Sequence, residues 1–258
     1  MLNFYFQRYF LVWLAGLITF MAMWGMVKLP DWRWFVVLLA VWLFFLIYLN
    51  NFKNKGIKNF WQTTPLLIFT VLAGVSLLGL LESKYWQWLV IVLEVCLVMF
   101  LLFLSGEAKG LTYEKKPVRR TLLMIWTFDL FAFWAGFFAL SLFFTQIPFW
   151  LLILLGSLLT GYISLLIWRL YFSVSLNKLF LPAVIIFLAV WELAWVIHLL
   201  PLGYLVLAML LVWAWYVGQL LLRFQMSVKG IIWQKQTVFL FSNLVLYFIF
   251  LFFFVRWL

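Results

Sequence analysis

Three acidic residues stand inside long apolar stretches of the sequence, and they are the side chains best suited to chemistry there. These residues are Glu94, Asp129 and Glu192. A charged carboxylate at the centre of a bilayer costs about 2.5 to 3.5 kcal/mol, so each group should face the interior of a helix bundle and be protonated or paired. Such groups carry protons or cations in membrane transporters. The alternative is that each is a protonated or amide-paired contact between helices, and both interpretations stay open.

The depths of these groups suggest a track of polar side chains across the membrane. At a rise of about 1.5 Å per residue, Glu94 and Glu192 lie about 10 Å below the outer surface, and Asp129 lies about 12 Å from the cytoplasmic one. Other polar residues fall at nearby depths on neighbouring apolar stretches. The candidate polar track has an outer group and an inner group: Glu94, Glu192 and His198, then Asp129, Asn243 and Gln219.

The apolar stretches that carry these residues define the fold class. The chain of 258 residues is 69% hydrophobic and its mean hydropathy is +1.18, which excludes a water-soluble fold. A spanning helix needs about 20 apolar residues and satisfies its own backbone hydrogen bonds. We therefore expect an all-α, polytopic transmembrane helical bundle that forms a single integral-membrane domain over residues 1–258, with no separate soluble domain.

About nine spans are expected, and eight is the alternative. They cover residues 9–27, 33–49, 64–81, 87–104, 122–144, 149–171, 179–199, 204–222 and 237–255. The residues before the first span hold only Arg8 as a basic residue, and no small-residue cleavage pattern follows that span. We therefore expect the first span to be retained as a membrane helix rather than removed as a signal peptide.

The basic residues predict how the chain is oriented. Of the 18 Lys and Arg residues, all but Lys28, Arg33, Lys84 and Arg256 fall on one side of the nine-span arrangement, which is 14 against 4. Positive residues stay on the cytoplasmic side during insertion. The pattern predicts a cytoplasmic N-terminus and a multi-pass protein of the cytoplasmic (inner) membrane.

The same residues suggest partners. The longest loop, residues 105–121, is a candidate docking loop for a soluble or membrane protein, and its basic residues are Lys109, Lys115, Lys116, Arg119 and Arg120. The simpler interpretation is a solvated loop that only sets orientation. Basic residues interleaved with aromatic ones in other cytoplasmic loops predict contact with anionic lipid headgroups. Because the positive charge is spread over several short loops and forms no single stripe, nucleic acid is not an expected partner.

Enzyme signatures are mostly missing from the sequence. There is one histidine, His198, and one cysteine, Cys96, which lies inside the fourth span. We find no phosphate-binding glycine loop, no zinc-binding HExxH and no nucleophile elbow. No catalytic residue, cofactor or metal site is predicted, and catalysis is disfavoured.

Small residues four apart predict where the spans pack, because close backbone approach supplies the attraction between helices in lipid. The pairs are Ala132 with Gly136, Ala135 with Ala139, Gly156 with Thr160, Ser157 with Gly161, and Ala214 with Gly218. They place spans five, six and eight inside the bundle. Span nine has hardly any small residue and is expected at the periphery.

Three functions fit these observations. A permease or permease subunit would use the buried carboxylates as proton or cation relays. A noncatalytic assembly or scaffold protein would bind partners or anionic lipids through its basic loops. An enzyme acting on lipid-linked substrates comes third.

Overall fold

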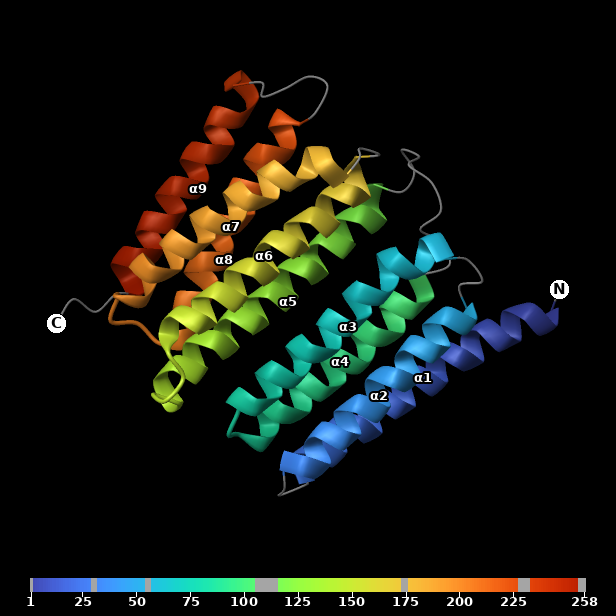
Figure 1. Ribbon diagram of the computed structural model, residues 1–258. Coiled ribbons are helices and arrows are strands. Elements are labelled where there is room, and N and C mark those ends of the chain that lie inside the picture. The colour runs from blue at the N-terminus through green and yellow to red at the C-terminus, as the bar shows by residue number, and fades with distance from the viewer. Residues whose placement is uncertain are drawn as a thin grey trace. The chain divides into compact units, whose positions relative to one another are not determined.

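The computed structural model describes residues 2–28, 32–53, 57–104, 116–172, 176–226 and 233–254. Within these ranges the chain forms nine helices and no strand, so the all-α prediction is confirmed (Figure 1). The helices are α1 (Leu2–Lys28), α2 (Trp32–Lys53), α3 (Ile57–Leu80), α4 (Lys84–Leu104), α5 (Lys116–Phe143), α6 (Phe149–Tyr171), α7 (Leu176–His198), α8 (Tyr204–Gln225) and α9 (Trp233–Phe254).

Seven of the described helices are long and apolar enough to cross a bilayer: α1, α2, α4, α5, α6, α7 and α8. The other two, α3 and α9, hold shorter apolar stretches, Thr64–Leu80 and Thr237–Phe250. The apolar stretches are shorter because polar residues interrupt the first turns of both helices: α3 begins IKNFWQ and α9 begins WQKQ. The protein is a multi-pass membrane protein whose helices contact the lipid bilayer.

The chain divides into two compact units, Met1–Asp129 and Leu130–Leu258, and α5 contributes residues to both. In the first unit, α1 packs against α2 and α4, and α3 also packs against α2 and α4. Buried hydrogen bonds join these helices. The indole N–H of Trp42 donates to Thr19 Oγ1 at 3.2 Å, and the amide of Asn50 donates to Thr64 Oγ1 at 3.0 Å.

In the second unit, α6 packs against α7, and α7 packs against α8. Two buried tryptophans also reach the small polar face of α6. Trp134 Nε1 of α5 donates to Thr160 Oγ1 at 3.0 Å, and Trp215 Nε1 of α8 donates to Ser164 Oγ at 2.9 Å. Thr160 and Ser164 are one turn apart and so share a face. The predicted packing of spans five and six through their small residues is confirmed, because those residues are buried, whereas Ala214 and Gly218 of α8 are only partly buried.

The hydrogen bond from Trp215 of α8 to Ser164 of α6 should make a measurable contribution to stability. We expect Trp215→Phe to lower the free energy of unfolding by about 0.6 kcal/mol and at most about 1.7, the range for hydrogen bonds between membrane helices. Adding Ser164→Ala should then cost little beyond the hydroxyl's own bond to the Thr160 carbonyl at 2.8 Å, because the bond to Trp215 is already absent. Detergent-induced unfolding would measure both. The control is Trp150→Phe at an exposed tryptophan, and equal stability of the Trp150 and Trp215 variants would contradict the assignment.

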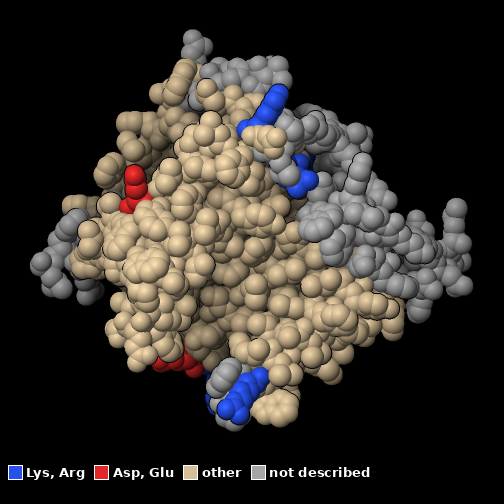
Figure 2. Space-filling view, in the orientation of Figure 1, with Lys and Arg blue, Asp and Glu red and all other residues tan. Residues whose placement is uncertain are grey.

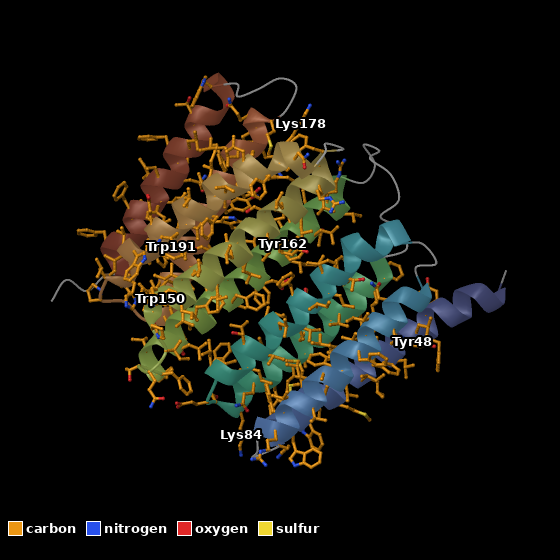
Figure 3. The ribbon with its side chains drawn as sticks, in the orientation of Figure 1. Tyr48, Lys84, Trp150, Tyr162, Lys178 and Trp191 are labelled. Atoms are coloured by element: carbon orange, nitrogen blue, oxygen red, sulfur yellow. The ribbon has the colours of Figure 1, made fainter. Side chains whose placement is uncertain are left out.

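The surface agrees with a membrane setting. The described basic side chains lie at or near helix ends, and they are Lys28, Arg33, Lys84, Arg119, Arg120, Arg169, Lys178 and Arg223. In Figure 2 most of the described surface in view is neither acidic nor basic, and Figure 3 shows Lys84 and Lys178 at the starts of their helices. In α9, each side chain whose exposure is described is at least partly exposed, so α9 lies at the surface of the second unit, as expected.

Candidate functional site

Glu94 and Asp129 form a pair of buried carboxyl groups in the first unit, which we call the carboxyl pair. Both side chains are 0% exposed. Glu94 is the eleventh of the 21 residues of α4, and Asp129 is the fourteenth of the 28 residues of α5. Both therefore lie at the middle of their helices. The two groups are close enough to interact electrostatically.

One face of helix α3 contacts both members of the carboxyl pair. Thr70 and Gly74 are one turn apart on this face, and both are buried. Thr70 Oγ1 lies 2.9 Å from Asp129 Oδ2 and also 2.9 Å from the carbonyl oxygen of Leu66. The site thus joins three helices, α3, α4 and α5.

The Glu94 carboxyl group occupies the space that a side chain at position 74 would fill, because Gly74 has no side chain. A Cβ atom added at Gly74 would lie 2.6 Å from the carboxyl carbon of Glu94 and would also clash with Oε2. These distances are far inside van der Waals contact. Only a residue without a side chain fits here while Glu94 keeps its position.

The carboxyl pair has unused hydrogen-bonding capacity. Among the residues that the structure describes, none bonds to either oxygen of Glu94 or to Oδ1 of Asp129. A buried polar group without a partner is costly, and a buried charge without one costs more. The surroundings add little polarity, since Trp126, one turn before Asp129 on α5, is buried and packs on Phe69 of α3 with ring centroids 5.6 Å apart.

The other acidic residue of the polar track has a different environment. Glu192 of α7 lies in the second unit and its side chain is exposed. His198 ends the same helix and stacks on Phe149, with ring centroids 3.7 Å apart, and faces Phe138 at 6.4 Å. The histidine is thus held among aromatic rings of α5 and α6.

The two amide residues of the polar track also belong to the second unit. Gln219 of α8 is fully buried, and neither amide atom has a hydrogen-bond partner within the described part of the chain. Asn243 joins α9 to α8, because its Oδ1 accepts from Trp213 Nε1 at 3.1 Å while its amide donates to the Phe239 carbonyl at 2.8 Å. Asn243 therefore has a clear packing role.

Of the six residues of the polar track, the structure brings Glu94 and Asp129 into one site. Their positions in the sequence had indicated different depths for these two residues, with Glu94 grouped with Glu192. Thr70 and Gly74 were not among the predicted site residues. A signal for them exists in the sequence, because they are small residues four apart, the same spacing that marked the contacts of spans five, six and eight.

The candidate docking loop falls mostly outside the described residues, which exclude positions 105–115 and therefore Lys115. Lys116 begins α5, but its side chain is not among those described. Arg119 is partly buried and Arg120 is exposed in the first turns of that helix.

No protein-family model, curated protein or solved structure matches this chain. In the described ranges, no group of three or more His, Cys, Asp or Glu side chains could hold a metal ion. The fold and the composition define the class, a multi-pass α-helical membrane protein. The carboxyl pair is the group of described side chains best suited to a chemical role.

Proposed function

We propose that the protein is a permease or a permease subunit of the cytoplasmic (inner) membrane in which Glu94 and Asp129 relay protons or cations. The supporting observation is the carboxyl pair itself: two fully buried, interacting carboxyl groups at mid-helix, without a basic partner among the described residues. Each would cost about 2.5 to 3.5 kcal/mol if charged at the bilayer centre. Apolar residues would pack there at lower cost, so a role in ion movement accounts for their presence.

The proposed topology has nine spans and a cytoplasmic N-terminus. Helices α3 and α9 contain 24 and 22 residues. At about 1.5 Å per residue they reach about 36 and 33 Å, enough for a hydrocarbon core of about 30 Å even though their apolar stretches are shorter. The unequal distribution of basic residues supports this orientation. Because α5 runs without a break through the boundary between the two units, we treat residues 1–258 as one integral-membrane domain.

Carboxamide substitutions test the relay, because Gln and Asn keep the shape of Glu and Asp but carry no exchangeable carboxyl proton. In the native host, Glu94→Gln and Asp129→Asn should each reproduce the growth defects of a deletion strain across a panel of nutrient, salt and pH conditions. Membrane abundance of each variant must match the wild type. Glu82→Gln is the matched control, since Glu82 is exposed in the turn before α4, and it should behave as wild type.

A scaffold would give the opposite result. Neutralising the docking-loop residues Lys115, Lys116, Arg119 and Arg120 would then reproduce the deletion, while both carboxamide variants would grow normally. Wild-type growth of the Glu94→Gln and Asp129→Asn strains would refute the relay. Purification in nanodiscs with mass spectrometry of co-purifying proteins separates a permease subunit from a self-contained carrier.

A further inference from the structure

We propose that the second unit binds a phosphate group between α6 and α8, with Arg223 supplying positive charge and Trp168 and Gln219 supplying hydrogen bonds. This inference goes beyond the relay and does not depend on it, since the carboxyl pair belongs to the first unit. It assigns a ligand to Gln219, a residue of the polar track whose amide has no partner among the described residues.

Two side-chain contacts show how the facing sides of α6 and α8 are matched. Trp215 Nε1 donates to Ser164 Oγ at 2.9 Å, and further along both helices the guanidinium carbon of Arg223 lies 4.4 Å from the ring centroid of Tyr171. Both helices run in the same direction, because α7 returns the chain (Figure 1). The two contacts are about two helical turns apart on each helix, so the same faces stay opposite each other over this length.

Trp168 and Gln219 lie in the turn between these two contacts. Trp168 is one turn after Ser164 on α6, and Gln219 is one turn after Trp215 on α8, so each lies on the facing side of its helix. Both side chains are 0% exposed. Within the described ranges, the indole N–H of Trp168 and both amide atoms of Gln219 have no hydrogen-bond partner. Buried polar groups are costly unless something pairs with them, which indicates a ligand between the two helices.

Arg223 brings a positive charge to the same place. Long side chains of a helix lean toward its N-terminal end, so the guanidinium group of Arg223 lies over the turn that holds Gln219. Its Nη1 atom is buried and has no hydrogen-bond partner in the part of the chain that the structure describes. An arginine that only reached out to the membrane surface would expose its guanidinium nitrogens instead.

The second unit offers no acidic partner to this arginine. Residues 130–258 contain one acidic side chain, Glu192. Because α7 runs opposite to α8, Glu192 lies about 20 Å from Arg223 along the helices, counted at about 1.5 Å per residue. The Glu192 side chain is also exposed. A bound anion would supply the missing negative charge.

The unpartnered atoms suit a phosphate group. They are mainly donors, the N–H groups of an indole, an amide and a guanidinium, and an oxyanion accepts from all three. The planar guanidinium group matches phosphate because it can donate two parallel hydrogen bonds. A metal cation would find no acidic ligand among these side chains.

The position of Arg223 indicates how the phosphate group would enter. Arg223 lies two residues before the end of α8 and is partly exposed, whereas Trp168 and Gln219 are fully buried one turn further in. The end of a membrane helix lies near the headgroups, so the phosphate group would enter at Arg223. A phospholipid headgroup and a soluble phosphate compound share this chemistry.

Unfolding of the full chain in delipidated dodecyl maltoside micelles tests the site, because a ligand that binds only the folded protein raises the unfolding midpoint as its concentration rises. One arm adds phosphatidylglycerol, and its control is diacylglycerol with the same acyl chains, which lacks the phosphate group. The other arm adds sodium phosphate, and its control is sodium chloride at equal ionic strength. We expect the midpoint to rise with at least one phosphate probe and with neither control.

Substitutions connect this response to the named side chains. Arg223→Gln and Trp168→Phe should each weaken binding by about 10- to 100-fold, the usual effect of losing a hydrogen bond to a charged group. Gln219→Leu should weaken it too, yet unfold no earlier than wild type without a probe, because leucine leaves no polar atom unpaired. A role in packing alone would instead lower the midpoint without a probe. The matched control is Arg169→Gln, since Arg169 lies at the same end of α6 but is exposed.

The outcomes separate the two sources of phosphate. A rise with phosphatidylglycerol alone identifies a phospholipid, and a rise with sodium phosphate identifies a soluble phosphate compound. The proposal is overturned if neither phosphate probe raises the midpoint. It is also overturned if Arg169→Gln weakens the response as much as Arg223→Gln, which would indicate general attraction to surface charge.

Discussion

Replacing Gly74 with alanine should destabilise the protein by about 1 to 3 kcal/mol, the usual cost of inserting atoms into a packed interior. The new Cβ would lie 2.6 Å from the carboxyl carbon of Glu94, and that side chain is fully buried. Either α3 and α4 must separate or the carboxyl group must leave its position. We expect a lower midpoint in detergent-induced unfolding and, in the relay assays, a loss of function comparable with that of Glu94→Gln.

The same helix supplies a matched control. A Cβ at Gly79 would meet no atom within 4 Å, so Gly79→Ala should leave stability unchanged or raise it by as much as about 1 kcal/mol, the helix preference of alanine over glycine. Shortening the opposing side chain should relieve the clash, so Glu94→Ala should recover part of the stability lost in Gly74→Ala. If Gly74→Ala and Gly79→Ala unfold alike, the Glu94 carboxyl group does not lie against α3 as described.

The second large effect should come from Gly156 of α6, against which the Trp134 ring of α5 packs. A Cβ there would lie 2.7 and 2.9 Å from two ring carbons of Trp134 and 3.1 Å from the Phe137 ring. Trp134 is 1% exposed, and its N–H group is bonded to Thr160, so the ring cannot turn aside without losing that bond. Gly156→Ala should therefore cost about 1 to 3 kcal/mol or more, measured by the same unfolding assay.

Gly218 is the control for this second substitution. It lies in α8, and a Cβ there would meet only Ile186 Cδ1 at 3.8 Å, an ordinary contact. Gly218→Ala should be tolerated. Trp134→Phe should partly restore the Gly156→Ala variant by shortening the ring, and a Gly156→Ala protein as stable as Gly218→Ala would show that α5 and α6 are farther apart than the structure places them.

Much of the fold follows from features that can be read locally in the sequence. Apolar stretches of the right length predicted the helices, and polar turns predicted where α3 and α9 become apolar, at Thr64 and Thr237. Small residues four apart predicted the packing faces of α5 and α6, because the spacing reports directly on which face can approach another helix. In α8 the same spacing was misleading, because Ala214 and Gly218 are only partly buried. The absence of small residues likewise predicted the exposed position of α9.

The site required information that local patterns do not contain. A depth counted from a span boundary shifts by about 1.5 Å for each residue of error in that boundary. Errors of a few residues are enough to assign Glu94 and Asp129 to different depths although they belong to one site. Depth also says nothing about which helices are neighbours. The contact of α4 and α5 with the same face of α3 is a tertiary fact, so Thr70 and Gly74 could be recognised only after the helices were placed.

Glu192 shows a second limit of sequence patterns. In a soluble helix, the polar face identifies the exposed side, but α7 is apolar on nearly all sides and gives no such reference. The expectation that an intramembrane carboxylate faces the interior held for Glu94 and Asp129, which are buried, whereas Glu192 is exposed on its unit. Helix rotation in a membrane protein is therefore set by packing partners more than by hydropathy.

The central claim is that the carboxyl pair couples proton movement to movement of a solute. The most direct measurement is current from proteoliposomes on a solid-supported membrane, recorded while pools of sugars, amino acids, nucleosides, organic acids and inorganic ions are applied under a pH gradient. The account predicts that at least one pool gives a pH-dependent current in the wild type and in Glu82→Gln, and none in Glu94→Gln or Asp129→Asn. A current of equal size in all four proteins, or no current from the wild type with any pool, would contradict it.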